Sequence, residues 1–199
     1  MNVVLILYPT EFKCLSKFKR KIARLTSNLA DFRIVSTADP NALIETLCKE
    51  QRVGFKIISD WKSAAITHAI IFDDGEVFPQ ESEWFRHQQI GLRIIKIKIT
   101  RVINVHRQKE FAGLKSTSAY EYIGRGSYWG NPYSMHAENE NREEVIRLFK
   151  YDFDNDKFPR KRKSEVYKLA GKRLGCFCKP EACHGDVIAD FLNSWDDGN

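Results

Sequence analysis

The sequence has no apolar run that approaches the ~18 residues of a membrane-spanning helix. Its opening apolar stretch, residues 3–8, stops at Pro9 and has no basic region before it, so it does not resemble a secretory signal. Cysteine is scarce and odd in number, with 5 residues in 199, and three of the five crowd into positions 176–183. That distribution is unlike a secreted disulfide framework and is typical of free thiols in a reducing compartment. These absences predict a soluble, cytoplasmic protein with no membrane partner.

The composition is that of a folded globular chain. Hydrophobic residues make up 43% and charged residues 29%, which supplies a packed core and argues against a disordered chain. The length suits one large domain or two smaller ones. The net charge of +6 favours a phosphate-bearing partner without selecting one.

Short apolar strands and helical segments alternate through the first half of the chain. Strands are predicted at residues 3–8, 33–36, 55–59, 67–72 and 92–100, and helices lie between most of them. Such alternation predicts an α/β fold with a parallel sheet. We therefore expect a Rossmann-like domain over residues 1–100 and a second, smaller α/β domain over residues 101–199.

The first half resembles a degenerate member of the SLOG superfamily of Rossmann-like nucleotide and nucleoside binders. The resemblance rests on the Asp60-Trp61 pair and on the turn at residues 72–76. The glycine-bearing loops of that family are replaced here by Tyr8-Pro9-Thr10 and by residues 36–40. Glycines in such loops let backbone amides approach a phosphate. Their absence favours a scaffold or docking role over retained nucleotide binding.

A glycine-rich loop at residues 122–133 combines anion donors with flat aromatic side chains. Its arginine and serine suit an anion, and its tryptophan could support a base or a sugar. The alternative is a tight structural turn pinned by aromatic residues. The ligand-binding residues predicted in this loop are Gly124, Arg125, Gly126, Ser127, Trp129, Gly130 and Asn131.

The densest basic cluster of the chain follows at residues 160–163. Its members are Arg160, Lys161, Arg162 and Lys163. Such a run is usually a solvated surface, and its alternative role is weak association with nucleic acid. The sequence has no heptads, zinc-finger spacing or recognition-helix pattern, so sequence-specific DNA binding is not indicated.

The segment 171–186 has the highest density of potentially reactive or metal-binding side chains in the chain. Residues 174–178 are predicted to form a buried strand with Cys176 and Cys178 on one face. Cys183 and His184 then lie at a helix start beyond the carboxyl end of that strand, where parallel sheets place their ligands. The helix dipole there stabilises an anion or a thiolate, so we expect Cys183 to be the most reactive thiol and the strand cysteines to be more buried.

Three interpretations of this segment remain open. In a reaction site, Cys183 is a nucleophile, His184 and Asp186 handle protons, and Cys178 and Lys179 contact the ligand. In a structural role, the thiols are small buried side chains. A zinc site would use the three cysteines and His184. The ligand types suit zinc, but the spacing does not, because adjacent residues seldom reach one metal.

The second half also resembles a family. The pair of motifs Ile-Gly-Arg-Gly-Ser-x-Trp-Gly-Asn-Pro and Gly-Cys-x-Cys-x-Pro-x-x-Cys-His-Gly-Asp is similar to an uncharacterised domain of bacteria and phages. Together the two resemblances imply a phage or bacterial protein that binds or processes a nucleotide-derived small molecule. If it is an enzyme, it is expected to hydrolyse or transfer at a glycosidic or phosphoester bond. The alternatives are a ligand-sequestering or host-interaction protein and a nucleic-acid-binding protein.

Overall fold

The computed structural model describes residues 1–134, 141–158 and 160–198. The chain divides into two compact units, Met1–Ile97 with Ser194–Asn199, and Lys98–Asn193. The sequence assigned everything after residue 100 to the second domain, whereas the C-terminal tail groups with the first unit. No helix in the described part of the chain is long and apolar enough to cross a membrane.

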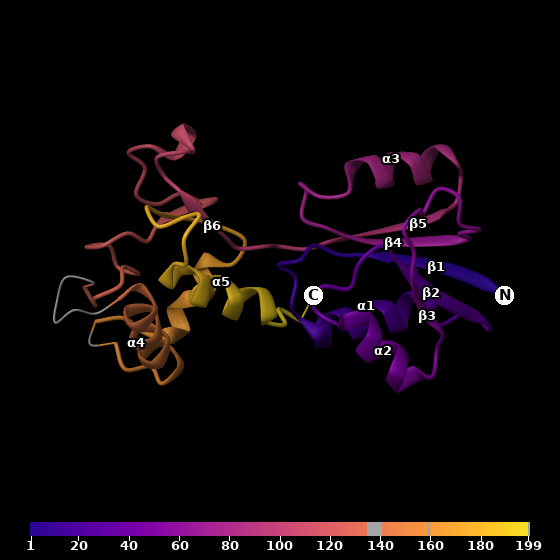
Figure 1. Ribbon diagram of the computed structural model, residues 1–199, viewed down its shortest axis with the longest axis horizontal. Coiled ribbons are helices and arrows are strands. Elements are labelled where there is room, and N and C mark those ends of the chain that lie inside the picture. Colours follow the sequence, from indigo (N-terminus) through magenta and orange to yellow (C-terminus); the bar gives the residue numbers. More distant parts are fainter. Residues whose placement is uncertain (135–140, 159, 199) are drawn as a thin grey trace. The chain divides into compact units, whose positions relative to one another are not determined.

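The first unit is built on a sheet of five parallel strands in the order β3-β2-β1-β4-β5. Its helices α1 and α2 lie on one side of the sheet and α3 lies on the other (Figure 1). The elements in chain order are β1 (Asn2–Leu7), α1 (Leu15–Thr26), β2 (Phe32–Ser36), α2 (Leu43–Gln51), β3 (Phe55–Ile57), β4 (His68–Asp73), α3 (Pro79–His87) and β5 (Gly91–Lys96). The predicted α/β fold is confirmed.

The apolar runs of the central strands explain this order. β1 and β4 are buried along almost their whole length because helices cover both faces of the sheet. Val3, Leu5 and Ile71 pack with Phe85 of α3 in one core cluster. On the other side, the rings of Phe18 in α1 and Phe72 stack with centroids 5.2 Å apart.

The end of this sheet where Rossmann-like folds bind phosphate is closed by the protein's own side chains. Asp39 accepts hydrogen bonds from the backbone N–H groups of Ile44 (3.1 Å) and Glu45 (2.9 Å) at the start of α2. Tyr8, directly after β1, donates its hydroxyl to the same carboxylate. Free amides at a helix start are what would hold a phosphate. Here a carboxylate already accepts from two of them.

The second unit contains three parallel strands in the order β6-β8-β7. Its elements are β6 (Arg101–Asn104), the 3₁₀ helix η1 (Lys109–Phe111), β7 (Tyr120–Tyr122), α4 (Arg142–Asp154), the 3₁₀ helix η2 (Lys163–Leu169), β8 (Arg173–Cys176) and α5 (His184–Ser194). Phe149 and Phe153 of α4 pack with Ile188 and Leu192 of α5 in its core.

The two ends of the second unit are joined by a reciprocal pair of buried hydrogen bonds. The Asn193 side chain accepts from the backbone N–H of Thr100 (2.8 Å) and donates to its carbonyl (3.0 Å). The chain therefore enters and leaves this unit at one place.

Candidate functional site

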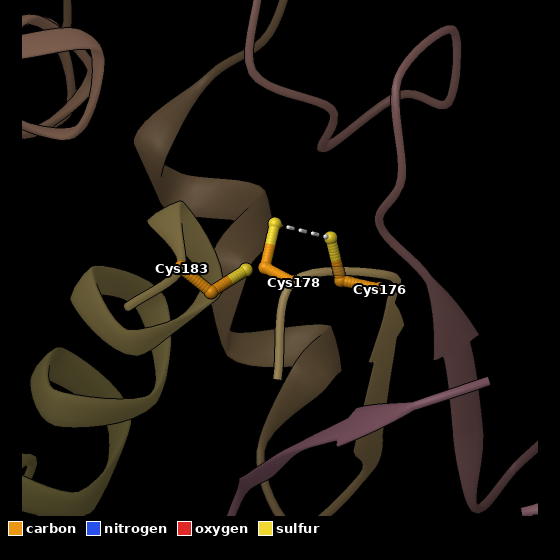
Figure 2. Close-up of side chains that lie close together, drawn as sticks. All are labelled: Cys176, Cys178 and Cys183. Atoms are coloured by element: carbon orange, nitrogen blue, oxygen red, sulfur yellow. Dashed lines mark hydrogen bonds between the residues drawn. The ribbon is translucent and has the colours of Figure 1, made fainter. Parts of the chain in front are cut away.

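Three cysteine side chains converge at the carboxyl end of β8. Cys176 is the last residue of that strand, Cys178 lies in the loop after it, and Cys183 directly precedes α5. Their sulfur atoms all lie within 4.8 Å of one another, and the Cys176 and Cys178 sulfurs are 3.5 Å apart (Figure 2). We call these three residues the thiol triad. The sequence pattern placed Cys176 and Cys178 on one face, and their thiols are indeed neighbours.

Hydrogen bonds fix the loop that carries the triad. The side-chain amide of Asn104, at the end of β6, donates to the carbonyls of both Phe177 and Lys179. The Asp186 carboxylate accepts from the backbone N–H of Cys183 (2.9 Å) and pairs with the Lys179 ammonium (2.7 Å). Asp186 and Lys179, predicted to handle protons and to contact a ligand, hold the turn together in this structure.

The pKa shifts of the three thiols differ from the sequence prediction, which expected a thiolate at Cys183. Hydrogen bonds from the Cys183 thiol and from the backbone N–H of Cys178 lower the pKa of Cys176 to about 5. Donation to Cys176, together with burial, raises the pKa of Cys183. Burial also raises the pKa of Cys178, with the Cys176 charge adding to the effect. Of the three thiols, Cys176 is the one whose pKa is lowered.

The expectation that Cys183 is the accessible thiol is wrong. Cys183 is 1% exposed, whereas Cys178 is partly exposed. Cys183 does lie at the start of α5, as predicted, and its sulfur accepts from the backbone N–H of Gly185 (3.4 Å). However, the core of the second unit packs over its side chain. A helix start confers reactivity only where solvent or a ligand can reach it.

His184 is buried and held from two sides. Its Nε2 lies 3.0 Å from the carbonyl oxygen of Ile123, and its Nδ1 lies 3.7 Å from the Cys183 sulfur. A bond to a carbonyl requires a proton on Nε2, which leaves Nδ1 unprotonated beside the Cys183 sulfur. Burial lowers the pKa of His184, so the ring is neutral at pH 7. It positions Cys183.

A pocket of about 190 Å³ opens beside the triad. We call it the thiol pocket. Besides the thiols and His184, its lining includes Arg125 and Asn131 of the glycine-rich loop, Arg142 at the start of α4, and Phe177. Arg142 is close enough for its charge to act on the Cys178 thiol. The thiol pocket therefore combines sulfur, two guanidinium groups and the aromatic rings of Tyr133 and Phe177.

The two arginines are oriented by neutral partners. Arg125 donates to the Ser134 hydroxyl (3.1 Å) and to the Tyr133 carbonyl (3.2 Å), and Arg142 donates to the Ala182 carbonyl (3.2 Å). Within the described ranges, no carboxylate forms an ion pair with either side chain. Among the described residues, the hydrogen-bond partners of both guanidinium groups are uncharged oxygen atoms.

Three residues of the glycine-rich loop, Arg125, Asn131 and Tyr133, line the thiol pocket. Gly124, Gly126, Ser127, Trp129 and Gly130 are not among its lining residues. The prediction that a base or sugar stacks on Trp129 is wrong, because this side chain is 4% exposed and belongs to the core. The Ser127 hydroxyl is buried without a hydrogen-bond partner among the described residues.

Arg142 and Phe177 are among the pocket residues that sequence reasoning missed. Nothing in the local sequence of Arg142 indicates that α4 brings it to the triad. Phe177 carried a usable signal, because the period of two that pairs Cys176 with Cys178 turns the residue between them outward. It is 50% exposed.

The basic cluster at residues 160–163 is partly internal. The Lys161 ammonium donates to the Gly130 carbonyl (2.6 Å) and lies over two phenylalanine rings. Lys163 lies over the rings of Phe153 and Phe191. Arg160 and Arg162 are exposed. Association with nucleic acid through this cluster stays a prediction, with Lys161 and Lys163 held against aromatic rings.

Two family models match the chain, one in each half. Residues 1–103 match the family model of the minimal SLOG domain, and residues 103–194 match that of a domain of unknown function, DUF4326. Both expected resemblances are confirmed.

One relative comes from a virus of bacteria. The uncharacterized 12.4 kDa protein in the nrdA-td intergenic region of Enterobacteria phage T4 is 46% identical over 72 residues, which is 36% of this chain and 65% of the phage protein. No solved structure matches the chain. The matches fit a phage or bacterial protein.

Proposed function

Because the chain belongs to the minimal SLOG domain family and carries a DUF4326 domain, we propose that it binds a phosphate-bearing nucleotide derivative in the thiol pocket. The observation that carries the proposal is the pair of arginines, Arg125 and Arg142, that line one small pocket without carboxylate partners in the described chain. Guanidinium groups bind phosphate oxygens through charge-assisted hydrogen bonds. The net charge of +6 favours the same class of ligand.

The size of the pocket limits which part of the ligand enters it. Its volume of about 190 Å³ is below the roughly 300–1,000 Å³ of sites that enclose a whole drug-sized molecule. A phosphate or a phosphorylated sugar fits this space, and a base would remain outside. The exposed ring of Phe177 lies at the pocket and is supported by His106, with ring centroids 4.8 Å apart. We assign the base to this ring, because every base has a flat face that can stack on an aromatic side chain.

The first unit also has a pocket, of about 270 Å³, but its lining includes one guanidinium group, that of Arg93, whereas the thiol pocket has two. The end of its sheet where Rossmann-like folds bind phosphate is occupied. The Asp39 carboxylate already accepts from the amides at the start of α2. A phosphate there would meet a negative charge instead of free donors. We therefore assign the ligand to the second unit and a scaffold role to the first.

Cleavage of a glycosidic or phosphoester bond in the bound ligand extends the proposal. In the metal-free protein, a thiol nucleophile would come from Cys178, because it is the partly exposed member of the triad. Incubation of the protein with the ligands, followed by mass spectrometry of the small molecules, distinguishes turnover from retention of unchanged ligand.

Calorimetry on the whole reduced protein tests the binding itself. The probes are the four common nucleoside diphosphates, the matching free nucleosides, and inorganic pyrophosphate. We expect diphosphates to bind, pyrophosphate to bind more weakly and nucleosides to bind least. Arg142→Gln should weaken diphosphate binding at least tenfold, since a hydrogen bond to a charged group contributes about 1.5–3 kcal/mol.

Arg147→Gln is the matched control. Arg147 lies on the same helix but is exposed and paired with Glu144 (2.6 Å). Its substitution should leave the affinity unchanged. Equal effects of the two substitutions, or no binding of any phosphate-bearing probe, would contradict the proposal.

A further inference from the structure

We propose that the thiol triad is a metal site that binds one zinc ion through Cys176, Cys178 and Cys183. The three sulfurs form a group within 4.8 Å, and in the described chain no other cluster of histidine, cysteine or acidic side chains gathers in this way. Thiolates are soft ligands and select zinc among the common divalent ions of cells. This inference goes beyond the proposed ligand binding and does not depend on it.

The distances suit a tetrahedral centre. Zinc–sulfur bonds of about 2.3 Å in tetrahedral geometry place two sulfurs about 3.8 Å apart. The Cys176 and Cys178 sulfurs are 3.5 Å apart, and the remaining separations stay within 4.8 Å (Figure 2). Small side-chain rotations are therefore enough to bring all three sulfurs onto one ion.

The elements that carry the ligands are already held in place. Cys176 ends a paired strand, so its backbone is fixed by the sheet. Asn104 holds the loop that follows, and Asp186 caps the turn at Cys183. A prearranged site loses little conformational entropy when the metal binds.

His184 is not the fourth ligand. Its Nε2 is engaged by the Ile123 carbonyl, and its Nδ1 faces the Cys183 sulfur. The sequence had counted it among four candidate ligands, and the structure retains only the cysteines as a group. The triad borders the thiol pocket, so a fourth position would face that space and accept water or an anion.

The charges around the triad fit such a centre. Binding zinc to three thiolates releases the thiol protons and leaves one net negative charge. Arg142 and Arg125 line the same pocket and offset that charge. A structural zinc site is fully enclosed by four protein ligands, whereas three ligands and an open position are typical of sites that engage a substrate.

Metal titration of the full chain tests this inference. We expect reduced, metal-stripped protein to bind one cobalt ion per chain, with the intense near-ultraviolet absorption of thiolate-to-cobalt charge transfer, and one equivalent of zinc to abolish that absorption. X-ray absorption of the zinc form should show three sulfur neighbours and one lighter atom. Elemental analysis of protein purified without chelators should find one zinc per chain.

Variants identify the ligands. Cys178→Ser should lower cobalt affinity at least 100-fold, and its partial exposure makes it the triad substitution least disruptive to the fold. Cys14→Ser is the matched control, because this buried thiol of the first unit already contacts the Ser16 hydroxyl (3.4 Å). It should bind cobalt as the unsubstituted protein does. Circular dichroism confirms that each variant is folded.

Several outcomes would overturn the inference. They are the absence of charge-transfer absorption in folded, fully reduced protein, a Cys178→Ser variant that binds cobalt unchanged, and a zinc shell with fewer than three sulfurs. Because the titration uses metal alone, failure of the nucleoside diphosphates to bind would leave a positive result intact. Loss of metal binding would equally leave the calorimetry with Arg142→Gln as an independent test.

Discussion

Replacing Gly130 by alanine separates the two interpretations of the glycine-rich loop. A Cβ at this position would lie 2.6 Å from the Gly124 carbonyl oxygen, 3.2 Å from that of Ser127 and 3.3 Å from the Arg125 Cα. The first distance is about 0.8 Å shorter than an ordinary contact of 3.4 Å. All three neighbours are backbone atoms, so none can rotate away. Overpacking costs about 1–3 kcal/mol, and we expect the upper end of that range here.

Gly126→Ala is the matched control within the same loop. Gly126 has a positive φ of 82°, but a Cβ added there would meet nothing within 4 Å, so only the left-handed backbone opposes the substitution. That conformation costs an alanine about 1 kcal/mol. Gly130→Ala should therefore destabilise the second unit by about 2 kcal/mol more than Gly126→Ala.

Urea unfolding followed by tryptophan fluorescence measures the difference. Trp129 is the one tryptophan between residues 98 and 193, and it lies next to the substituted glycine. If the loop is a packed turn, unfolding midpoints should fall in the order unsubstituted, Gly126→Ala, Gly130→Ala. Equal midpoints for the two variants would refute the packing argument. If both variants kept full stability but lost ligand binding, the loop would instead be a ligand-binding loop.

Three further predictions concern other parts of the chain. In metal-free reduced protein, iodoacetamide should label Cys178 before Cys183 because Cys183 is buried, and peptide mass spectrometry showing the reverse order would contradict the thiol assignment. Burial lowers the pKa of Lys161 to about 8 from 10.5, so between these values the unfolded chain holds a proton that the folded chain lacks. The free energy of unfolding, relative to that of Lys161→Met, should therefore rise across this pH window by on the order of 1 kcal/mol after allowance for solvent screening. A difference in urea midpoints that does not change with pH would contradict this prediction. Asp197→Asn removes the charged partner of buried Lys17 (2.7 Å), which should destabilise the first unit by about 2 kcal/mol in thermal unfolding, whereas an unchanged midpoint would show the ion pair to be neutral.

The order of strands and helices in the first unit could be predicted from the sequence because parallel strands buried on both faces form short apolar runs. The segments 3–8 and 67–72 are such runs, and both became central strands. The sequence placed Cys176 and Cys178 on one face of a strand over residues 174–178, whereas β8 ends at Cys176 and the loop after it brings Cys178 to the same side.

The sequence did not reveal which side chains the core covers. Cys183 and Trp129 have sequence neighbours typical of an exposed site, yet the core packs over both. Arg142 was missed because the local sequence of a helix start does not show which distant loop that helix start faces. Burial and pocket lining depend on contacts between segments far apart in the chain, and local patterns carry no information about them.

The hydrogen bonds between Thr100 and Asn193 give the second unit the architecture of an insertion. Its two ends lie together, and the chain on either side belongs to the first unit. A segment with adjacent ends can be placed within a host domain without pulling the host's strands apart. A protease that cuts one of the two connections would leave both halves covalently joined through the other. Gain, loss or exchange of the thiol-bearing module would thus need only two breakpoints, near residues 98 and 193, and the five-stranded sheet would keep its order.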